Sequence, residues 1–352
     1  MATEASEPEP TSGRTGGRGR RATITDVAAA AGASRSTTSR ALSGQGYVSP
    51  EVRDRVQRAA RSLGYVPDAL ARGLKRRSST SIGVLVSDLS NVFYAQLAAG
   101  ASRRAKELGF TTLLADTQVQ SKEELAAAQA FLELRVAGVV VTPVSARISG
   151  WLVDHEIPTV ELDRSFGRAG VDSVAVDNFR ASEAATAHLV GLGHRRIALL
   201  IDETDWTTGR RRYEGYRSAL QAAGLKPNDA DVVASGWDAT AASEATRALL
   251  RRRRPPTAIF AANNLLAEGA WRAVHEAGLR VPRDLSLIGF DDAPWMTLVQ
   301  PAVSTVVQNA IALGEAAVSR VVHRIGRPTE PRQEVVLGAE LQLRGSTARA
   351  PR

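Results

Sequence analysis

The pattern of apolar and polar positions changes character twice along the chain. Residues 1–21 are rich in Glu, Pro, Ser, Thr, Gly and Arg and have no apolar periodicity, which predicts a disordered tail. Residues 22–66 carry apolar positions at helical spacing in three short stretches. From Ser81 onward, short apolar runs alternate with longer amphipathic stretches. The pattern therefore predicts a tail, a small all-α domain and a large α/β core.

Capping residues mark the helix boundaries in the small domain. Thr23 stands three residues before Asp26, which is the spacing of a capping box. Gly32 is expected to stop the first helix, and Ser34 to cap the second. Ser49 precedes a proline at the first position of a third helix. Two short helices joined by a tight turn and packed on a third are typical of a helix-turn-helix domain.

The second predicted helix carries side chains that suit the major groove of DNA. Arginine can donate two hydrogen bonds to guanine, and serine or threonine can contact a base edge or a phosphate. A helical bundle with a merely polar surface is the alternative, but the helix lengths, the turn glycine and the charge favour DNA binding. The candidate DNA-contacting residues of this domain are Thr23, Ser34, Arg35, Ser36, Thr37, Ser39 and Arg40.

The core repeats an alternation of strands and helices. The predicted strands are Ile82–Val86, Thr111–Ala115, Gly138–Thr142, Pro158–Glu161, Ser173–Val176, Arg196–Leu200, Ala230–Ala234, Ala258–Ala261 and Ser286–Phe290. The predicted helices are Tyr94–Leu108, Lys122–Arg135, Phe179–Gly191, Arg210–Ala223, Ala239–Arg252 and Asn264–Ala277. Near-continuous apolar strands between helices predict two doubly wound parallel sheets. No glycine-rich nucleotide loop and no nucleophile motif follows any strand.

Polar and aromatic side chains gather directly after the predicted strands, where open α/β sheets bind their ligands. Carboxylates, amides and Arg side chains match hydroxyl groups, and flat aromatic rings cover the apolar faces of a sugar ring. A salt-bridged loop pair is the alternative for Asp163 and Arg164, and a surface aromatic for Trp237, whereas Asp292 is assigned a structural role. The candidate effector-binding residues are Asn91, Phe93, Tyr94, Asp163, Arg164, Arg212, Trp237, Asn263, Asp291 and Gln308.

Composition narrows the chemistry. The 352 residues contain no cysteine, which excludes disulfides and thiolate metal sites, and none of the five histidines stands at a metal-ligand spacing. We therefore expect neither a metal nor a cofactor. No apolar run reaches the roughly 20 residues of a membrane span, and no apolar signal core follows the N-terminus. The expected location is the cytoplasm.

The charge is concentrated at one end of the chain. Residues 1–77 hold 14 of the 45 Lys and Arg residues but only 7 of the 37 acidic residues, so +7 of the +8 net charge lies there. A basic head on a nearly neutral body is typical of a protein in which one small domain binds a polyanion. The charge thus agrees with a DNA-binding head.

Several motifs then occur in a fixed order. The head contains TITDVA at 23–28, AGAS at 31–34, TTSRAL at 37–42 and ARGLK at 71–75. In their order and spacing these motifs, and the sequence of the core as far as Arg344, resemble the lactose/galactose repressor (LacI/GalR) family of bacterial transcriptional regulators. The core also resembles periplasmic ribose-binding proteins. The resemblance implies a helix-turn-helix domain, a hinge helix and a two-lobed periplasmic-binding-protein-like core.

The resemblance also implies roles for individual residues. Arg35, Ser36 and Arg40 fall at positions that read base edges. Leu74, which precedes Lys75, falls where the hinge-helix leucine wedges into the minor groove, and such a wedge kinks DNA. The effector-binding candidates fall where ribose-binding proteins hold their monosaccharide.

Two further residues of the core are interpreted as structural. At Asn264 the family often has Asp, and because this position begins a helix we interpret the change as one of capping. His194 is expected to be a helix-end residue rather than a ligand.

The resemblance divides the chain into five parts. These are a disordered basic tail at 1–21, the helix-turn-helix domain at 22–66, the hinge helix and linker at 67–78, the effector-binding and dimerisation core at 79–345, and a disordered tail at 346–352. Lobe 1 of the core is expected at about 80–176 plus 310–337, and lobe 2 at about 177–308 plus 338–345. The last tail has no leucine heptads, so we expect a dimer without a tetramerising helix.

The sequence as a whole predicts a sugar-responsive, DNA-binding transcriptional regulator that acts as a repressor. It would bind a palindromic operator as a homodimer and be released or tightened by a monosaccharide. A solute-binding protein of sugar transport is one alternative, against which the helix-turn-helix domain argues. A sugar-acting α/β enzyme is the other, with Asp163, Asp291 and Asp292 as candidate acids, but no hydrolytic motif accompanies them.

Overall fold

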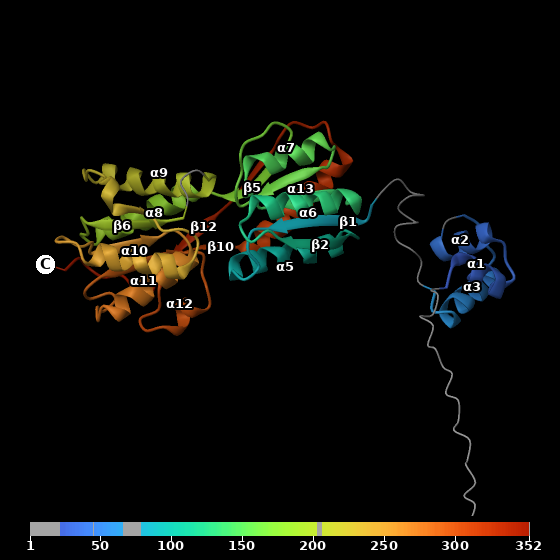
Figure 1. Cartoon of the computed structure of the whole chain (residues 1–352), viewed down its shortest axis with the longest axis horizontal. Helices are drawn as coiled ribbons and strands as arrows, with labels where there is room; N and C mark the ends of the chain where they lie inside the picture. Colours follow the sequence, from blue (N-terminus) through green and yellow to red (C-terminus); the bar gives the residue numbers. More distant parts are fainter. Residues whose placement is uncertain (1–21, 45, 66–78, 203–205, 352) are drawn as a thin grey trace, which may run out of the picture. The chain divides into compact units, whose positions relative to one another are not determined.

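The computed structural model describes residues 22–44, 46–65, 79–202 and 206–351. The chain divides after Ser78 into two compact units, and Figure 1 labels the elements of both. The predicted tail at 1–21 and the predicted hinge at 67–78 lie outside the described residues, and so do Leu74 and Lys75.

The first unit consists of α1 (Ile24–Ala31), α2 (Arg35–Ser43) and α3 (Pro50–Ser62). Each predicted cap is present. Thr23 and Asp26 form the capping box, Ser34 accepts the N–H of Thr37, and Ser49 accepts the N–H of Val52. A small apolar core holds the three helices together and is made by Val27, Ala31, Ala41, Val48, Val56, Ala59 and Ala60. The prediction of an N-terminal helix-turn-helix domain is confirmed.

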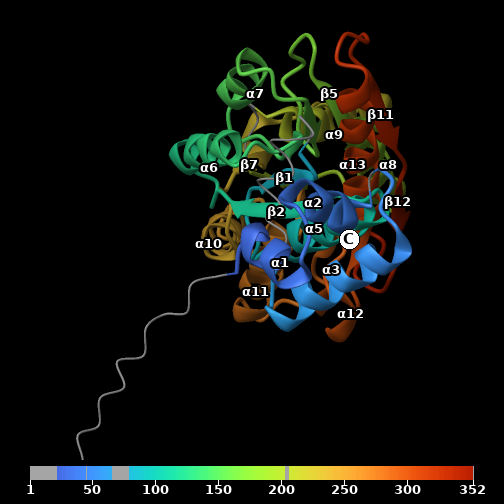
Figure 2. The ribbon, with the colours of Figure 1, turned by 90° about the vertical axis from the view of Figure 1, so that its right-hand side faces the viewer.

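The second unit contains two six-stranded sheets among its described residues. The first has the order β11-β5-β4-β3-β1-β2 and all its pairs are parallel. Its strands are β1 (Ser81–Val86), β2 (Thr111–Asp116), β3 (Gly138–Val141), β4 (Thr159–Leu162), β5 (Asp172–Val176) and β11 (Glu334–Leu337). Figure 2 shows β11, drawn in red, beside β5, drawn in green, so distant parts of the chain share this sheet.

The second sheet has the order β12-β10-β9-β8-β6-β7, and only β12 runs antiparallel to its neighbour. Its strands are β6 (Ile197–Ile201), β7 (Val232–Ala234), β8 (Ala258–Ala261), β9 (Ser286–Phe290), β10 (Ser304–Gln308) and β12 (Ala339–Gln342). The prediction of two parallel-dominated sheets is confirmed. It missed β10, β11 and β12, because the last two are partly exposed edge strands without a continuous apolar run.

Helices cover both faces of each sheet. The first sheet carries α5 (Val92–Glu107), α13 (Ala310–Gly326), α6 (Ser121–Glu133) and α7 (Ala146–Asp154). The second carries α8 (Asn178–Gly191), α9 (Thr207–Ala222), α10 (Ala239–Leu250), α11 (Asn264–Glu276) and the short α12 (Trp295–Leu298). The sequence pattern missed α7, α12 and α13. In the part of the chain that the structure describes, no helix has the length and apolarity of a membrane span.

The chain passes between the two sheets three times. The crossings follow β5, β10 and β11, at Asp177, Asn309 and Gly338. Asp177 and Asn309 cap the helices that begin there, since their side chains accept backbone N–H groups of α8 and α13. The two lobes are therefore joined by three short segments whose geometry is partly set by helix caps.

The described part of the C-terminal tail, residues 346–351, is packed on the second lobe, which contradicts the predicted disorder. Ser346 is fully buried; its Oγ donates to the carbonyl of Leu287, whose N–H in turn donates to Ser346 O. The buried ring of His194 lies 3.1 Å from the carbonyl of Ala348. His194 thus anchors this segment beyond the end of α8. The segment is held by hydrogen bonds and not by apolar burial, so the apolar pattern gave no sign of it.

Glycines let α5 and α13 pack backbone against backbone. A Cβ at Gly100 would lie 2.2 Å from the carbonyl oxygen of Ile311, and a Cβ at Gly314 would lie 2.1 Å from that of Leu97. Both distances are far below van der Waals contact, so no larger residue fits without separating the helices. This close contact fixes α13, which follows a crossing between the lobes, on the first lobe.

We expect Gly314→Ala to destabilise the protein by about 1–3 kcal/mol or more, because the added methyl group must push the two helices apart. Gly326→Ala is the matched control, since Gly326 ends the same helix and has open space where its Cβ would lie. Urea unfolding of both variants measures the difference. Equal stability of the two variants would show that the α5–α13 contact can relax.

Candidate functional site

The polar face of α2 is open to solvent. Arg35, Ser36 and Arg40 are exposed. Ser34 is occupied with capping, because its Oγ accepts the N–H of Thr37 at 3.0 Å and lies 2.9 Å from Ser36 Oγ. The two arginines therefore remain available on this face for a polyanion.

The other candidates of this domain have mixed environments. Thr23 is exposed but bound to Asp26, with 2.7 Å between Thr23 Oγ1 and Asp26 Oδ2. Thr37 and Ser39 are half-buried. Their roles in DNA binding stay predictions.

The loop after α2 lies against Arg40, which the sequence analysis did not foresee. Gly46 has a φ of +78°, and a Cβ there would lie 3.2 Å from Arg40 Cδ. The next residue, Tyr47, is 88% exposed, whereas Val48 is buried in the core of the domain. An anchored loop thus supports the arginine stem and presents an aromatic ring to solvent. An exposed Tyr between a turn glycine and a buried Val was the available sequence signal.

A cavity with an empty volume of about 530 Å³ lies between the two lobes of the second unit, a size typical of small-molecule sites. Nine of the ten predicted effector-binding residues line it, and the tenth, Gln308, donates from its amide to the lining residue Asp291. The sequence analysis did not select Asp202, Thr208, Ser87, Val119, Leu265 and Asp88, which also line the cavity. Asp202 directly follows β6, so the rule that found the others could have found it.

Arg164 is the most thoroughly bound side chain of the cavity. Its Nη2 donates to Ser87 Oγ and to the Tyr94 hydroxyl, both at 2.6 Å, and its Nη1 donates to the carbonyl of Pro143. Asp163 Oδ2 lies 3.6 Å from Arg164 Nε. All these partners belong to the first lobe, where they fully enclose the guanidinium group.

An aromatic pair from the second lobe completes this environment. The Arg164 guanidinium lies 3.7 Å from the ring centre of Trp206, and Trp206 stacks on Trp237 at 4.0 Å. A cation over an indole face is a favourable electrostatic contact. Trp237 is therefore part of the cavity wall and not an isolated surface aromatic.

Two pairs of hydrogen-bonding groups also join the lobes. The amides of Asn91 and Asn264 exchange hydrogen bonds of 3.2 and 2.9 Å, and the N–H of Ser165 donates to Thr207 Oγ1 at 3.0 Å. The interpretation of Asn264 as a cap is wrong. Asn263 caps α11 by accepting the N–H of Leu266, which leaves the next amide free to cross the cleft.

Arg212 lies in the second turn of α9 and is 3% exposed. Its Nε donates to Asn178 Oδ1 at 2.7 Å, and its Nη1 donates to the carbonyl of Ala262. Its guanidinium lies 3.7 Å from the ring centre of Phe290. Two of the three guanidinium nitrogens are thus held within the second lobe, which orients the group at the cavity.

Burial controls the carboxyl groups of the cavity. It raises the pKa of Asp163, against the opposing charges of Arg164 and Arg212. It also raises the pKa of Asp291 to about 6, although Arg212 and Gln308 act in the opposite direction. Both aspartates have positive φ, 67° and 64°. Backbone strain of this kind in a non-glycine residue is typical of functional sites.

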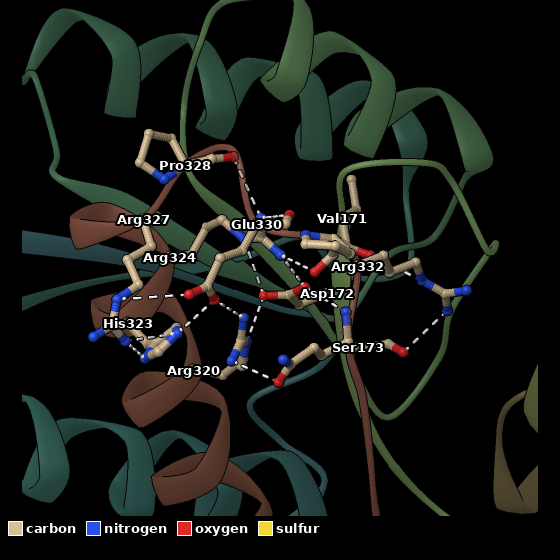
Figure 3. A network of polar contacts seen from close by, with 12 residues as sticks. Val171, Asp172, Ser173, Arg320, His323, Arg324, Arg327, Pro328, Glu330 and Arg332 are labelled. Atoms are coloured by element: carbon tan, nitrogen blue, oxygen red, sulfur yellow. Dashed lines mark hydrogen bonds and ion pairs between the residues drawn. The ribbon is translucent and has the colours of Figure 1, made fainter.

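A second polar network supports the first lobe away from the cavity (Figure 3). Buried Asp172 accepts hydrogen bonds from Arg320 and Arg324, and these hold its pKa below the usual range although burial acts to raise it. Arg332 donates to Ser165 Oγ at 3.2 Å. The loop before β11 thus holds Ser165, whose N–H reaches the second lobe.

Comparison with known proteins identifies both units. Residues 23–68 match bacterial regulatory proteins of the lacI family, and residues 186–347 match a periplasmic binding protein-like domain. The ribose operon repressor of Escherichia coli (strain K12) is 32% identical over 328 residues, which cover 92% of this chain and 99% of the repressor.

Two solved structures are similar over most of the core or more. The lac repressor dimer bound to operator and the anti-inducer ONPF has a TM-score of 0.83 and 28% identity, covering 94% of this chain and 100% of that chain. A lacI family regulator from Enterococcus faecium with bound ribose has a TM-score of 0.70 and 28% identity, covering 77% of this chain and 100% of that chain.

The raised pKa of Asp291 predicts how stability depends on pH. The folded protein binds this proton more tightly than the unfolded chain, whose Asp carboxyl has the usual pKa of 3.8. The contribution of Asp291 to the free energy of unfolding therefore falls as the pH rises from about 4 to about 6. Asp291→Asn should remove this loss and stabilise the protein at pH 7 by about 1–3 kcal/mol, since Asn tolerates positive φ.

Thermal unfolding between pH 4 and pH 8 measures this effect. The control is Asp284→Asn, because the exposed Asp284 has its pKa lowered by Arg280 and should give the opposite sign. A variant at position 291 that is less stable than the wild type at pH 7 would contradict the prediction.

Proposed function

The chain belongs to the lacI family of bacterial regulatory proteins, and we propose that it is a repressor that binds a palindromic operator as a homodimer and responds to a monosaccharide. Its relatives are transcriptional regulators and not enzymes. The observation that carries the proposal is a cavity between two lobes, lined by carboxylates, arginines and aromatic rings, in a chain that also has a helix-turn-helix domain with an exposed arginine face.

In the DNA-binding half, Arg35, Ser36 and Arg40 read base edges in the major groove. Thr23, Ser34, Thr37 and Ser39 contact or orient the phosphates, as hydroxyl groups near helix N-termini do. Leu74 and Lys75 act in the minor groove from the hinge. One helix-turn-helix per chain in a two-fold dimer requires two inverted half-sites.

We add Tyr47 to the proposed DNA interface. Its ring is exposed on a loop whose preceding residue supports Arg40, so the two side chains meet the same region of a bound duplex. A tyrosine hydroxyl can donate to a phosphate oxygen.

In the effector half, the ten predicted residues bind a monosaccharide. Asp163, Asp291 and Asn263 accept or donate hydrogen bonds to its hydroxyls, together with the amide of Gln308 and the side chains of Arg164 and Arg212. Phe93, Tyr94 and Trp237 cover its apolar faces, and Asn91 holds the lobes together. A change in lobe closure alters the hinge, which couples the sugar to the operator. Because the operator is chromosomal, the protein acts in the cytoplasm.

The support of Arg40 by Gly46 gives a test of the DNA-binding half. Gly46→Ala and Gly44→Ala should each destabilise the first unit by about 1–2 kcal/mol, because both positions have positive φ. Only Gly46→Ala displaces Arg40, since a Cβ at Gly44 meets open space. It should therefore relax the preference at one operator base pair, as Arg40→Ala does, at a loss of about 1–3 kcal/mol for Arg40→Ala.

Fluorescence anisotropy with operator variants at one fixed salt concentration measures this preference. If the two glycine variants discriminate base pairs equally well, Gly46 has no part in positioning Arg40.

The effector half is tested by Trp237→Leu in calorimetry with neutral monosaccharides. Loss of the flat face should weaken sugar binding by about 1 kcal/mol, roughly fivefold, and leave operator affinity without sugar unchanged. Trp271→Leu is the control, since Trp271 packs against Trp295 outside the cavity. Unchanged sugar affinity in the Trp237 variant would remove this ring from the site.

A further inference from the structure

The cavity holds more hydrogen-bond acceptors than available donors. The carboxylates of Asp163, Asp202 and Asp291 line it, and each residue is at least nine-tenths buried. A fourth carboxylate, Asp88, lies half-buried at the same cavity. An ionised carboxylate accepts hydrogen bonds and donates none. A ligand that fills this space must therefore be rich in donors.

The cationic side chains of the cavity are largely committed to protein acceptors. Arg164 donates to Ser87, to Tyr94 and to the carbonyl of Pro143. Arg212 donates to Asn178 and to the carbonyl of Ala262. The arginine donors therefore go mostly to fixed partners, and few of them remain for a ligand.

The amide donors are committed in the same way. The Nδ2 of Asn263 donates to Asp202 at 3.4 Å, that of Asn91 donates to Asn264, and the Nε2 of Gln308 donates to Asp291. The remaining amide oxygen, Oε1 of Gln308, is buried and has no hydrogen-bond partner among the described residues. It is one more acceptor beside Asp291.

The charges are unequal as well. The three buried aspartates face two arginines, so the buried lining carries one negative charge in excess. Asp202 provides the excess, and its charge acts on Asp163, Asp291 and Tyr94, whose pKa values it raises. Its position in the centre of this group, and not any lack of partners, is what matters. A neutral ligand that displaces water would leave this charge buried and uncompensated.

We propose that the natural effector carries a protonated amino group, and that it is an amino sugar whose ammonium group binds at Asp202. This inference rests on the proposed function, because it specifies the class of monosaccharide. An ammonium group donates three hydrogen bonds and accepts none, and it adds one positive charge. A hydroxyl brings one donor and two acceptor positions into a site already rich in acceptors. The ammonium group thus satisfies both the donor deficit and the charge excess.

The test compares aminated and neutral sugars on the full-length protein at pH 7. Calorimetry is performed with D-glucosamine against D-glucose, with D-galactosamine against D-galactose, and with the two N-acetylated amino sugars. At least one amino sugar should bind about tenfold more tightly than its neutral counterpart, because the ion pair is shielded from water. N-acetylation removes the charge and should abolish the preference.

Asp202→Asn removes the excess charge and keeps the size of the side chain. It should reduce the preference for the amine to less than about twofold and change the affinity for the neutral sugar by no more than about threefold. Asp238→Asn is the control, because Asp238 caps α10 at an exposed position outside the cavity. Should the Asp202 variant fail to fold, the N-acetylated sugars test the same charge in the wild-type protein.

The outcomes separate the two proposals. Binding of neutral sugars with equal or greater affinity than every aminated counterpart would overturn the amino-sugar inference alone. A preference for the amine that survives both acetylation and Asp202→Asn would overturn it as well. Failure of every sugar, neutral or aminated, to bind would overturn the monosaccharide effector itself, and the amino-sugar inference with it.

Discussion

The buried guanidinium of Arg164 is the interaction on which the core depends. A cation with 2% exposure persists only where every face of it is satisfied. The first lobe supplies oxygen acceptors around its edge, and the second lobe supplies the indole face of Trp206. The same side chain therefore packs the cavity wall and bridges the lobes. Its full satisfaction in one lobe means that the second lobe can move by losing only the aromatic contact.

Two kinds of contact divide the core into rigid and movable parts. Within each lobe, helices pack so closely that glycine is required, as at Gly314 on α5 and at Gly269, where a Cβ would lie 2.3 Å from the carbonyl of Ala239. Between the lobes, the contacts are few and polar, namely the Asn91–Asn264 pair and the Ser165–Thr207 bond. Dense packing resists deformation, whereas isolated hydrogen bonds exchange with water at small cost. Rotation at the three crossings is thus the easiest motion of the core.

The small DNA-binding unit uses the same principle on a local scale. Its three helices share a compact apolar core, while α2 leaves its arginines exposed. The loop through Gly46 then restricts where the stem of Arg40 can lie. Restricting a long side chain before binding lowers the entropy lost when it contacts a base. Rigidity beside an otherwise mobile arginine is what makes a reading position of it.

The sequence by itself determined the helix-turn-helix, because caps such as Thr23 and Ser34 act within four residues of their partners. It also determined most of the cavity, because the carboxyl ends of parallel strands meet at one edge and the residues after each strand must converge there. The tertiary structure alone decided the partners of those residues. Trp206 reaches Arg164, and Asn264 reaches Asn91, only once two separately folded lobes approach, and no local periodicity records such a contact. The segment after Arg344 is likewise held by hydrogen bonds to distant backbone, which leave no apolar pattern in the chain.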